Sequence, residues 1–330
     1  MLNRHLPAAV YHADWGSNPS KRWLARAVLE GSRYIAHPPE PVGDHTTLIA
    51  RARANMGRGS AMVGFDFPIG IPASYARLIG ATEFKSFLSQ LGRGKLADFY
   101  HVCSDASEVT KYRPFYPYKP GGKRQKHLLD ALQVAHMDDI RRKCELGRDG
   151  RKAANALFWT LGASQVGRAA IIGWRDVLAP AVGNDKSVVL WPFDGSLDAL
   201  LKPGNVVIVE TYPAECYGWF FQDGLKGKGD AEVRKKASGA LFEWAGKVNV
   251  KLDSDLMQTI EYGFPDGDDA FDATVGLFGM LEVLMGRREP GDPSEEGVRK
   301  VEGWILGQQS GSGGQTLKEL RRNGRPSARR

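Results

Sequence analysis

Cysteine is scarce in this sequence, and long apolar runs are missing. The 330 residues include three widely separated cysteines, Cys103, Cys144 and Cys216. Three scattered thiols do not make a disulfide framework or a cysteine-rich zinc site, which favours a reducing compartment and predicts a cytoplasmic protein. No stretch approaches the ~18 consecutive apolar residues that a membrane span requires, so no membrane association is expected. The seven histidines show no metal-ligand spacing.

What the chain does contain is typical of a globular protein. With 42% hydrophobic and 25% charged residues, it can form one large domain or two ordinary ones. The net charge of +7 is unevenly spread, because residues 310–330 hold six basic residues and one acidic residue. Gly and Ser precede these charges, which predicts a disordered basic tail over 309–330. A basic excess can indicate nucleic-acid binding, but an excess confined to a tail is more often a solvated segment.

The hydrophobic pattern predicts an α/β fold, a mixed sheet with helices on both faces. Residues 8–14, 22–29 and 32–36 predict a three-stranded meander, which three prolines within 38–41 should end. Further strands are expected at 61–67, 187–193 and 206–210. Helical crossovers should make the strands at 61–67 and 206–210 parallel to the first strand.

Helices are predicted at 46–56, near 75–79, and at 83–91, 127–146, 230–247, 253–262 and 266–286, with helical pieces within 153–179. Residues 84–201 interrupt the strand pattern and are interpreted as a mainly helical insertion or cap on the sheet. We therefore expect one domain over residues 1–308 with an insertion at about 84–201.

Acidic residues stand at the ends of the predicted strands. Asp14 ends the first strand, Asp66 follows the apolar run 62–65, and Glu210 ends the strand at 206–210. Ligands bind where the carboxyl ends of strands open, so these carboxylates are expected to converge at one edge of the sheet. Asp269 and Asp272 begin a very apolar helix, and their spacing of three places them on one helix face.

Each acid also has an ordinary structural explanation. Asp14 and Asp66 could cap turns, and Glu210 could pair with an arginine at the sheet edge. Asp269 suits the first turn of a helix capped by Asp266. Asp272 lies one turn deeper among apolar residues, where capping does not explain it, and it therefore favours function. Clustered carboxylates suit Mg²⁺ or Mn²⁺, and a pair of such ions can hydrolyse a phosphodiester.

Two stretches could contact a nucleic acid. Trp159, Arg168 and Arg175 belong to a stretch that interleaves aromatic and basic residues, which suits base stacking and phosphate contact, although such aromatics are more often core. Residues 111–126 hold six basic residues and no acid. Lys123 and Arg124 in that stretch are predicted to contact phosphate, and a solvated loop is the alternative.

Several motifs along the chain resemble those of one family. They are Asp14, Gly64-Phe65-Asp66-Phe67-Pro68-Ile69-Gly70, Phe158-Trp159, Glu210-Thr211-Tyr212-Pro213-Ala214-Glu215 and Asp269-Ala270-Phe271-Asp272-Ala273. From about Tyr11 to Gln308 the sequence resembles the predicted RNase H-fold nucleases of domain-of-unknown-function family 429. The resemblance implies a five-stranded RNase H-like core and two-metal phosphodiester hydrolysis. Asp14, Asp66, Glu210 and Asp272 would be catalytic, and the same four with Asp269 would hold the metal.

Two other functions stay open. The related fold of sugar kinases and actin also begins with an Asp-x-Gly turn, such as Asp14-Trp15-Gly16, and would make the protein an ATP-dependent phosphotransferase. That fold requires a second Asp-x-Gly turn in its C-terminal half, and this sequence has none. A non-catalytic nucleic-acid-binding protein with structural carboxylates is the other alternative. The acids favour the metal-dependent nuclease, whose substrate could be DNA, RNA or a small phosphoester.

Overall fold

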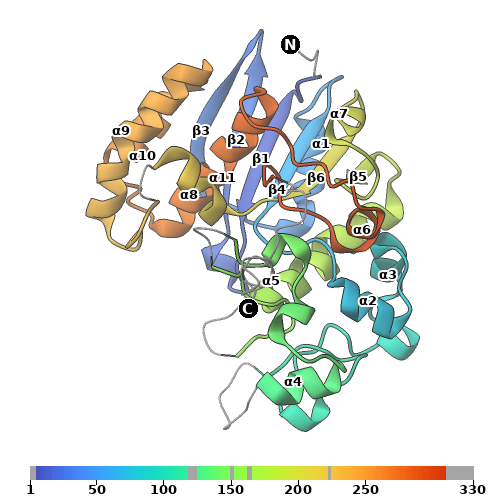
Figure 1. The fold of residues 1–330 in the computed structure, drawn as a ribbon. Helices are drawn as coiled ribbons and strands as arrows, with labels where there is room; N and C mark the ends of the chain where they lie inside the picture. Colours follow the sequence, from blue (N-terminus) through green and yellow to red (C-terminus); the bar gives the residue numbers. More distant parts are fainter. Residues whose placement is uncertain (1–4, 118–124, 149–151, 162–165, 222–223, 310–330) are drawn as a thin grey trace, which may run out of the picture.

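A mixed β-sheet forms the centre of the protein. The computed structural model describes residues 5–117, 125–148, 152–161, 166–221 and 224–309. The strands are β1 (Ala9–Asp14), β2 (Trp23–Glu30), β3 (Arg33–Pro41), β4 (Ala61–Phe65), β5 (Val188–Leu190), β6 (Val206–Glu210) and β7 (Lys251–Leu252). They lie in the order β5-β6-β4-β1-β2-β3-β7 (Figure 1). β2 is antiparallel to β1 and β3, and the other neighbouring pairs are parallel. The α/β class, the meander and the directions of β4 and β6 are confirmed.

β3 differs from its prediction, because it continues through the prolines at 38, 39 and 41. Its pairing with β2 shifts register between Leu24 and Arg26, which is where Pro38 and Pro39 fall. On the other side of β3, β7 pairs with Ile35 and Ala36. Proline lacks an N–H group, and strands tolerate it at bulges and on edges. Both conditions apply here, so the prediction that the prolines end the meander is wrong.

Helices cover both faces of the sheet. They are α1 (Leu48–Ala54), α2 (Ala73–Ile79), α3 (Phe84–Gln90), α4 (Gln125–Ala131), α5 (Val166–Ile172), α6 (Ala179–Asn184), α7 (Leu197–Leu200), α8 (Pro213–Phe220), α9 (Ala231–Val248), α10 (Ser254–Glu261) and α11 (Asp268–Leu284). Two π-helical segments, η7 (Gly173–Leu178) and η8 (Val298–Glu302), add to them. The predicted helices at 46–56, 75–79, 83–91, 230–247, 253–262 and 266–286 are confirmed as α1, α2, α3, α9, α10 and α11. No helix in these described ranges is both long and apolar enough to cross a membrane.

The long helix predicted at 127–146 is wrong. α4 ends at Ala131, and two short 3-10 turns follow, η5 (Met137–Ile140) and η6 (Lys143–Glu145). The Asp139 carboxylate accepts hydrogen bonds from the backbone N–H groups of Ala135 and His136. Such side-chain caps start new turns and compete with a continuous helix, although the apolar spacing alone resembles one helix face.

Alternate residues of each strand face two different cores. Ala9, Tyr11 and Ala13 of β1 face a core shared with α1, α5 and η7. Val10 faces a second core, formed with α8, α9 and α11. This alternation follows from the two-residue period of a strand. The alternation therefore determines which acids at the strand ends lie on the same face of the sheet.

The segment 84–201 does more than cap the sheet. β5 lies within it and joins the sheet beside β6. α2, α4 and α5 lie beyond one end of the sheet, below the strands in Figure 1. This end holds the carboxyl ends of β1, β4 and β6, because the chain passes from β4 directly toward α2. Residues 310–330, where the basic tail is predicted, lie outside the described residues.

Candidate active site

Asp14 and Asp66 lie side by side at the carboxyl ends of β1 and β4. Ala13 and Phe65 are paired in register, so the next residues, Asp14 and Asp66, form one row on the face that α11 covers. The Asp66 N–H donates to the Ala13 carbonyl over 3.1 Å. The two acids affect each other's ionisation, because the charge of Asp66 raises the pKa of Asp14.

α11 brings a third acid to this row. Asp272 is buried, with 6% of its surface exposed, on a helix whose residues are apolar on nearly every side. The helix packs against β1 at close range, where His12 Nδ1 and the Ala273 carbonyl oxygen are 2.9 Å apart. A Cβ atom on Gly276 would lie 2.1 Å from the His12 ring, so only glycine permits this approach.

The three acids repel one another, and we call Asp14, Asp66 and Asp272 the acidic cluster. Burial, followed by the charges of Asp66 and Asp272, raises the pKa of Asp14 well above its ordinary value. Burial and the charge of Asp272 raise the pKa of Asp66 to about 7. Burial also raises the pKa of Asp272, although Lys228 opposes this effect. The surroundings therefore compensate the ionised form of the cluster only in part.

Lys228 and Tyr217 hold Asp272. The Lys228 ammonium forms an ion pair with Asp272 Oδ2 and lies 3.7 Å from Asp268 Oδ2. The Tyr217 hydroxyl, on α8, donates to Asp272 Oδ1. Neither Lys228 nor Tyr217 was predicted from the sequence. A signal for Lys228 was available, because glycines at 224, 227 and 229 surround it with an unusually adaptable backbone.

Asp269 lies at the edge of the cluster. It belongs to the first turn of α11, and its side chain is 28% exposed and 3.3 Å from Lys21 Nζ. The N-cap of α11 is Gly267, so the prediction that Asp266 caps this helix is wrong. Asp269 therefore behaves as an acid of the first helical turn with a surface partner, the structural alternative considered for it.

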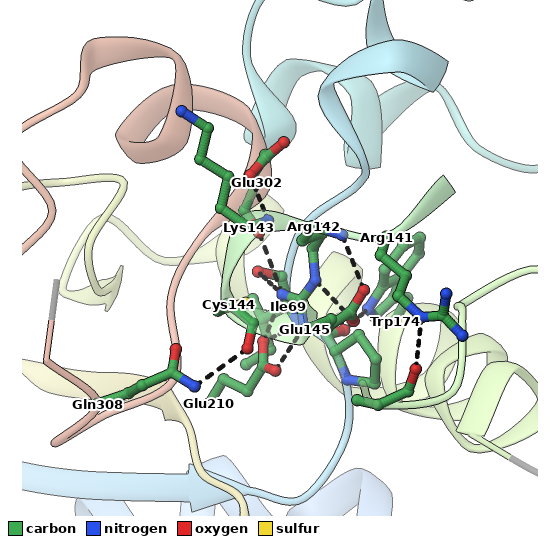
Figure 2. A network of polar contacts seen from close by, with 12 residues as sticks. Ile69, Arg141, Arg142, Lys143, Cys144, Glu145, Trp174, Glu210, Glu302 and Gln308 are labelled. Atoms are coloured by element: carbon green, nitrogen blue, oxygen red, sulfur yellow. Dashed lines mark hydrogen bonds and ion pairs between the residues drawn. The ribbon is translucent and has the colours of Figure 1, made fainter. Parts of the chain in front are cut away.

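Glu210 does not belong to the acidic cluster. Its register partner on β4 is Phe65, one residue before Asp66, so Glu210 faces the opposite side of the sheet. Arg142 binds it through two bonds, Nη1 to Oε2 at 2.6 Å and Nη2 to Oε1 at 2.5 Å (Figure 2). The Ile69 N–H also donates to Oε2 over 2.6 Å. We therefore correct the expectation for Glu210 and remove it from the catalytic and metal-binding residues.

Arg142 is the centre of a buried network that closes this end of the sheet (Figure 2). Its Nε donates to Glu145 Oε1 over 2.9 Å, and Nη1 donates to the Glu302 carbonyl over 3.1 Å. The Glu302 carboxylate accepts from the N–H groups of Ala73 and Lys143. Residues 298–308, which we call the strap, are thereby fixed across the carboxyl ends of β4 and β6. Nothing in the sequence pattern indicated Arg142.

The residues predicted to bind substrate are spread more widely. Trp159 stacks on Tyr116 with ring centroids 4.7 Å apart, and Arg175 pairs with Asp176 at 2.6 Å. Both contacts lie within the segment 84–201. Arg168 is half-buried on α5. Lys123 and Arg124 lie outside the described residues. A substrate role for these five residues stays a prediction.

The acidic cluster has oxygen ligands suited to Mg²⁺ or Mn²⁺, but not in a finished arrangement. Among the residues that the structure describes, no group of three or more His, Cys, Asp and Glu side chains is placed to hold a metal ion. Thr211 follows Glu210 and so shares the row of Asp14 and Asp66, and its buried Oγ1 has no hydrogen-bond partner among the described residues. An unpartnered buried oxygen beside repelling carboxylates is the chemistry that a hard cation fits.

Comparisons with known proteins assign no family to the chain. No family model, curated protein or solved structure matches it. The resemblance to a nuclease family therefore depends on the sequence motifs. Three of the acids in those motifs, Asp14, Asp66 and Asp272, form the acidic cluster.

Proposed function

We propose that the protein is a metal-dependent phosphodiester hydrolase, a nuclease with an RNase H-like fold. One observation carries the proposal: Asp14, Asp66 and Asp272 come from three separate parts of the chain and meet at the carboxyl ends of parallel strands, with one ammonium, that of Lys228, paired with Asp272. The meander followed by parallel strands β4 and β6 agrees with the five-stranded core that the sequence resemblance implies. β5 and β7 would be additions at its two edges.

Asp14, Asp66 and Asp272 would hold Mg²⁺ or Mn²⁺, and Thr211 Oγ1 is a further oxygen in the same row. A bound divalent cation would supply an activated water and neutralise charge on the phosphate of the substrate. The raised pKa values of Asp14 and Asp66 support a cation site, because a positive charge removes the repulsion that burial intensifies. Asp269 lies at the edge of the acidic cluster, where it would bind a cation only through a water molecule or by binding a second cation.

The chain's own residues prepare this chemistry. The pKa values of Asp14 and Asp66 are raised while no cation is present, and a bound cation would favour the ionised form of both carboxylates. The Tyr217 hydroxyl fixes the orientation of Asp272. Arg142 holds Glu210 and the strap, which keeps the ends of β4 and β6 in place. These groups hold the acids at a fixed separation, which an in-line displacement requires.

Nucleic acid is the proposed partner, and its support lies in the sequence. The basic residues of 111–126 and 310–330 suit the phosphates of DNA or RNA. Within the described residues of that stretch, Arg113 pairs with Glu108 at 3.0 Å, and Lys126, on α4, pairs with Asp130 at 2.8 Å. Lys123 and Arg124 lie outside the described residues and stay the predicted phosphate contacts of this stretch.

A non-catalytic nucleic-acid-binding protein is the second candidate. It is favoured by the contacts of Asp272, whose two oxygens are both taken by Tyr217 and Lys228. A carboxylate satisfied in this way can be structural. This function predicts binding to nucleic acid that does not depend on metal and is not followed by cleavage.

Cleavage assays separate the two candidates. The purified full chain would be incubated with duplex, branched and single-stranded DNA, RNA and a chromogenic phosphodiester, with Mg²⁺, Mn²⁺ or a chelator. We expect cleavage of at least one substrate with metal, its loss with chelator, and its loss in Asp66→Asn and Asp272→Asn. Asp255→Asn removes an exposed acid of α10 and is the matched control. Absence of cleavage in every condition, or full activity in Asp66→Asn, would contradict the nuclease proposal.

A further inference from the structure

Lys228 stands where the acidic cluster needs a positive charge. Its ammonium forms ion pairs with Asp272 and Asp268, and the charges of Asp272, Asp14 and Asp268 raise its pKa against the opposing effect of burial. The Lys228 side chain is 33% exposed, whereas that of Asp272 is 9% exposed. The lysine therefore reaches the buried acid from the solvent side.

The backbone at Lys228 is held by a hydrogen bond to its carbonyl, and the glycines on either side of it allow many conformations. Arg234, buried on α9, donates from Nη1 to the Lys228 carbonyl over 2.6 Å. The same guanidinium donates to the carbonyls of Gly263 and Phe264, just before α11 begins. Arg234 thus sets Lys228 against the start of the helix that carries Asp272. Gly227, with a φ of 78°, and Gly229 flank the lysine and leave the side chain free to change direction.

We propose that Lys228 is a resident counter-ion, which a divalent cation must displace from Asp272 to enter the acidic cluster. This inference depends on the proposed metal site. In the structure the ammonium takes Asp272 Oδ2, an oxygen that a cation bound by the cluster would need. An ammonium and a divalent cation at the same carboxylate oxygen repel each other, so the presence of one lowers the affinity of the site for the other.

The exchange of the Lys228 ammonium for a cation regulates access to the acidic cluster. While Lys228 is in place, the cluster is partly neutralised and closed on its solvent side. When a cation enters, the ammonium turns outward at little cost, because its side chain already reaches solvent and its backbone stays anchored by Arg234. Metal affinity is then lower than the three carboxylates alone would give, and the difference measures the competition.

Calorimetric titration with Mn²⁺ alone tests the competition. We expect Lys228→Met to bind Mn²⁺ about tenfold or more tightly than the wild type, within the range usual for coupling between two binding events. Lys228→Arg keeps the charge and should bind no more tightly than the wild type. Lys226→Met is the matched control, because Lys226 is exposed on the same glycine-rich segment and its loss changes the net charge equally.

A second measurement needs no variant of Lys228. Labelling with an amine-reactive reagent, read by mass spectrometry, should show several-fold faster modification of Lys228 when Mn²⁺ is added to the wild type, with Lys226 unchanged. This result decides the question if Lys228→Met does not fold. If the wild type binds Mn²⁺ but Lys228→Met binds it no more tightly, or if Lys228 labelling does not rise, the inference is overturned and the metal site stands. If neither protein binds Mn²⁺, the proposed metal site fails and the inference fails with it.

Discussion

Arg142 and Glu210 form a fully buried, two-bond ion pair across 68 residues of sequence. Their side chains are 1% and 5% exposed. Two charges withdrawn from water in this way are costly to separate, because whichever one is left has no solvent to stabilise it. The pair therefore makes the end of the sheet sensitive to any change at Arg142.

Replacing Arg142 by Met should lower the free energy of unfolding by about 3–5 kcal/mol, because Glu210 and Glu145 lose a buried partner. Urea denaturation followed by circular dichroism measures the change. Arg141→Met is the control, since Arg141 pairs with the exposed Asp138 and donates one hydrogen bond to the Ala154 carbonyl, and its loss should cost less, about 1–2 kcal/mol. Adding Glu210→Gln to Arg142→Met should restore part of the loss. Equal losses at 141 and 142 would show that the buried pair is unimportant.

The acidic cluster predicts a stability that falls as pH rises. The pKa of Asp66 is about 7 in the folded protein, against 3.8 for an ordinary aspartate. Between about pH 4 and 7 the folded state therefore binds a proton that the unfolded state has lost, and stability decreases across that window. Relative to Asp66→Asn, the metal-free wild type should lose a few kcal/mol at most between pH 4.5 and 7.5. Saturating Mn²⁺ should remove the decrease.

The comparison with Asp66→Asn is needed because other groups titrate in the same window. Burial lowers the pKa of His12 to about 4, which makes stability rise with pH and opposes the effect of the acids. His12 is present in both proteins, so its contribution largely cancels. Stability curves for the two proteins that run parallel from pH 4.5 to 7.5 would rule out a raised pKa at Asp66.

Gly276 should not tolerate a side chain. Ala at this position would place a methyl group 2.1 Å from the His12 ring and push α11 away from β1. We expect Gly276→Ala to lower the free energy of unfolding by about 1–3 kcal/mol, the usual cost of overpacking. The control is Gly246→Ala on α9, where a Cβ meets no atom within 4 Å. That change should stabilise by ~0.5–1 kcal/mol because alanine favours helix. Thermal unfolding of both variants checks the opposite signs.

The basic segments outside the described residues should control nucleic-acid binding. Removing 310–330, or reversing Lys123 and Arg124 to Glu, should weaken binding at low salt and flatten the dependence of affinity on salt concentration. Fluorescence anisotropy over a range of NaCl concentrations measures this slope. Lys235→Glu with Lys236→Glu makes the same charge change at exposed positions of α9. The same slope in all these proteins would assign the two basic segments to solvent. Removing 310–330 should leave the melting temperature unchanged.

The sequence predicted the acidic cluster better than its surroundings. Asp14 and Asp66 end apolar strands and Asp272 interrupts an apolar helix, so local pattern alone identified them. Glu210 has the same local pattern, but its side chain faces the other way. The difference is one position of register between β4 and β6, and that register is set by pairing across the sheet.

Residues that act over long sequence distances were missed for a related reason. Arg142 lies between two short turns, where no periodicity marks it, and its partners are 68 and 160 residues away. The prediction of one helix at 127–146 was wrong because Asp139 caps a new turn, and the spacing of apolar residues does not indicate such a cap. Lys228 differs from these cases, because its flanking glycines were visible in the sequence.

The contact between His12 and Ala273 spans 261 residues, and this has a consequence for biosynthesis. β1 leaves the ribosome early, but α11, which covers one of its faces, is translated roughly 260 residues later. At about 5–20 residues per second, the apolar sheet surface waits for tens of seconds before its cover exists. A nascent chain in this condition exposes strands that aggregate readily, so chaperones should bind it during translation. Fragments that end before α11 should be insoluble when expressed alone.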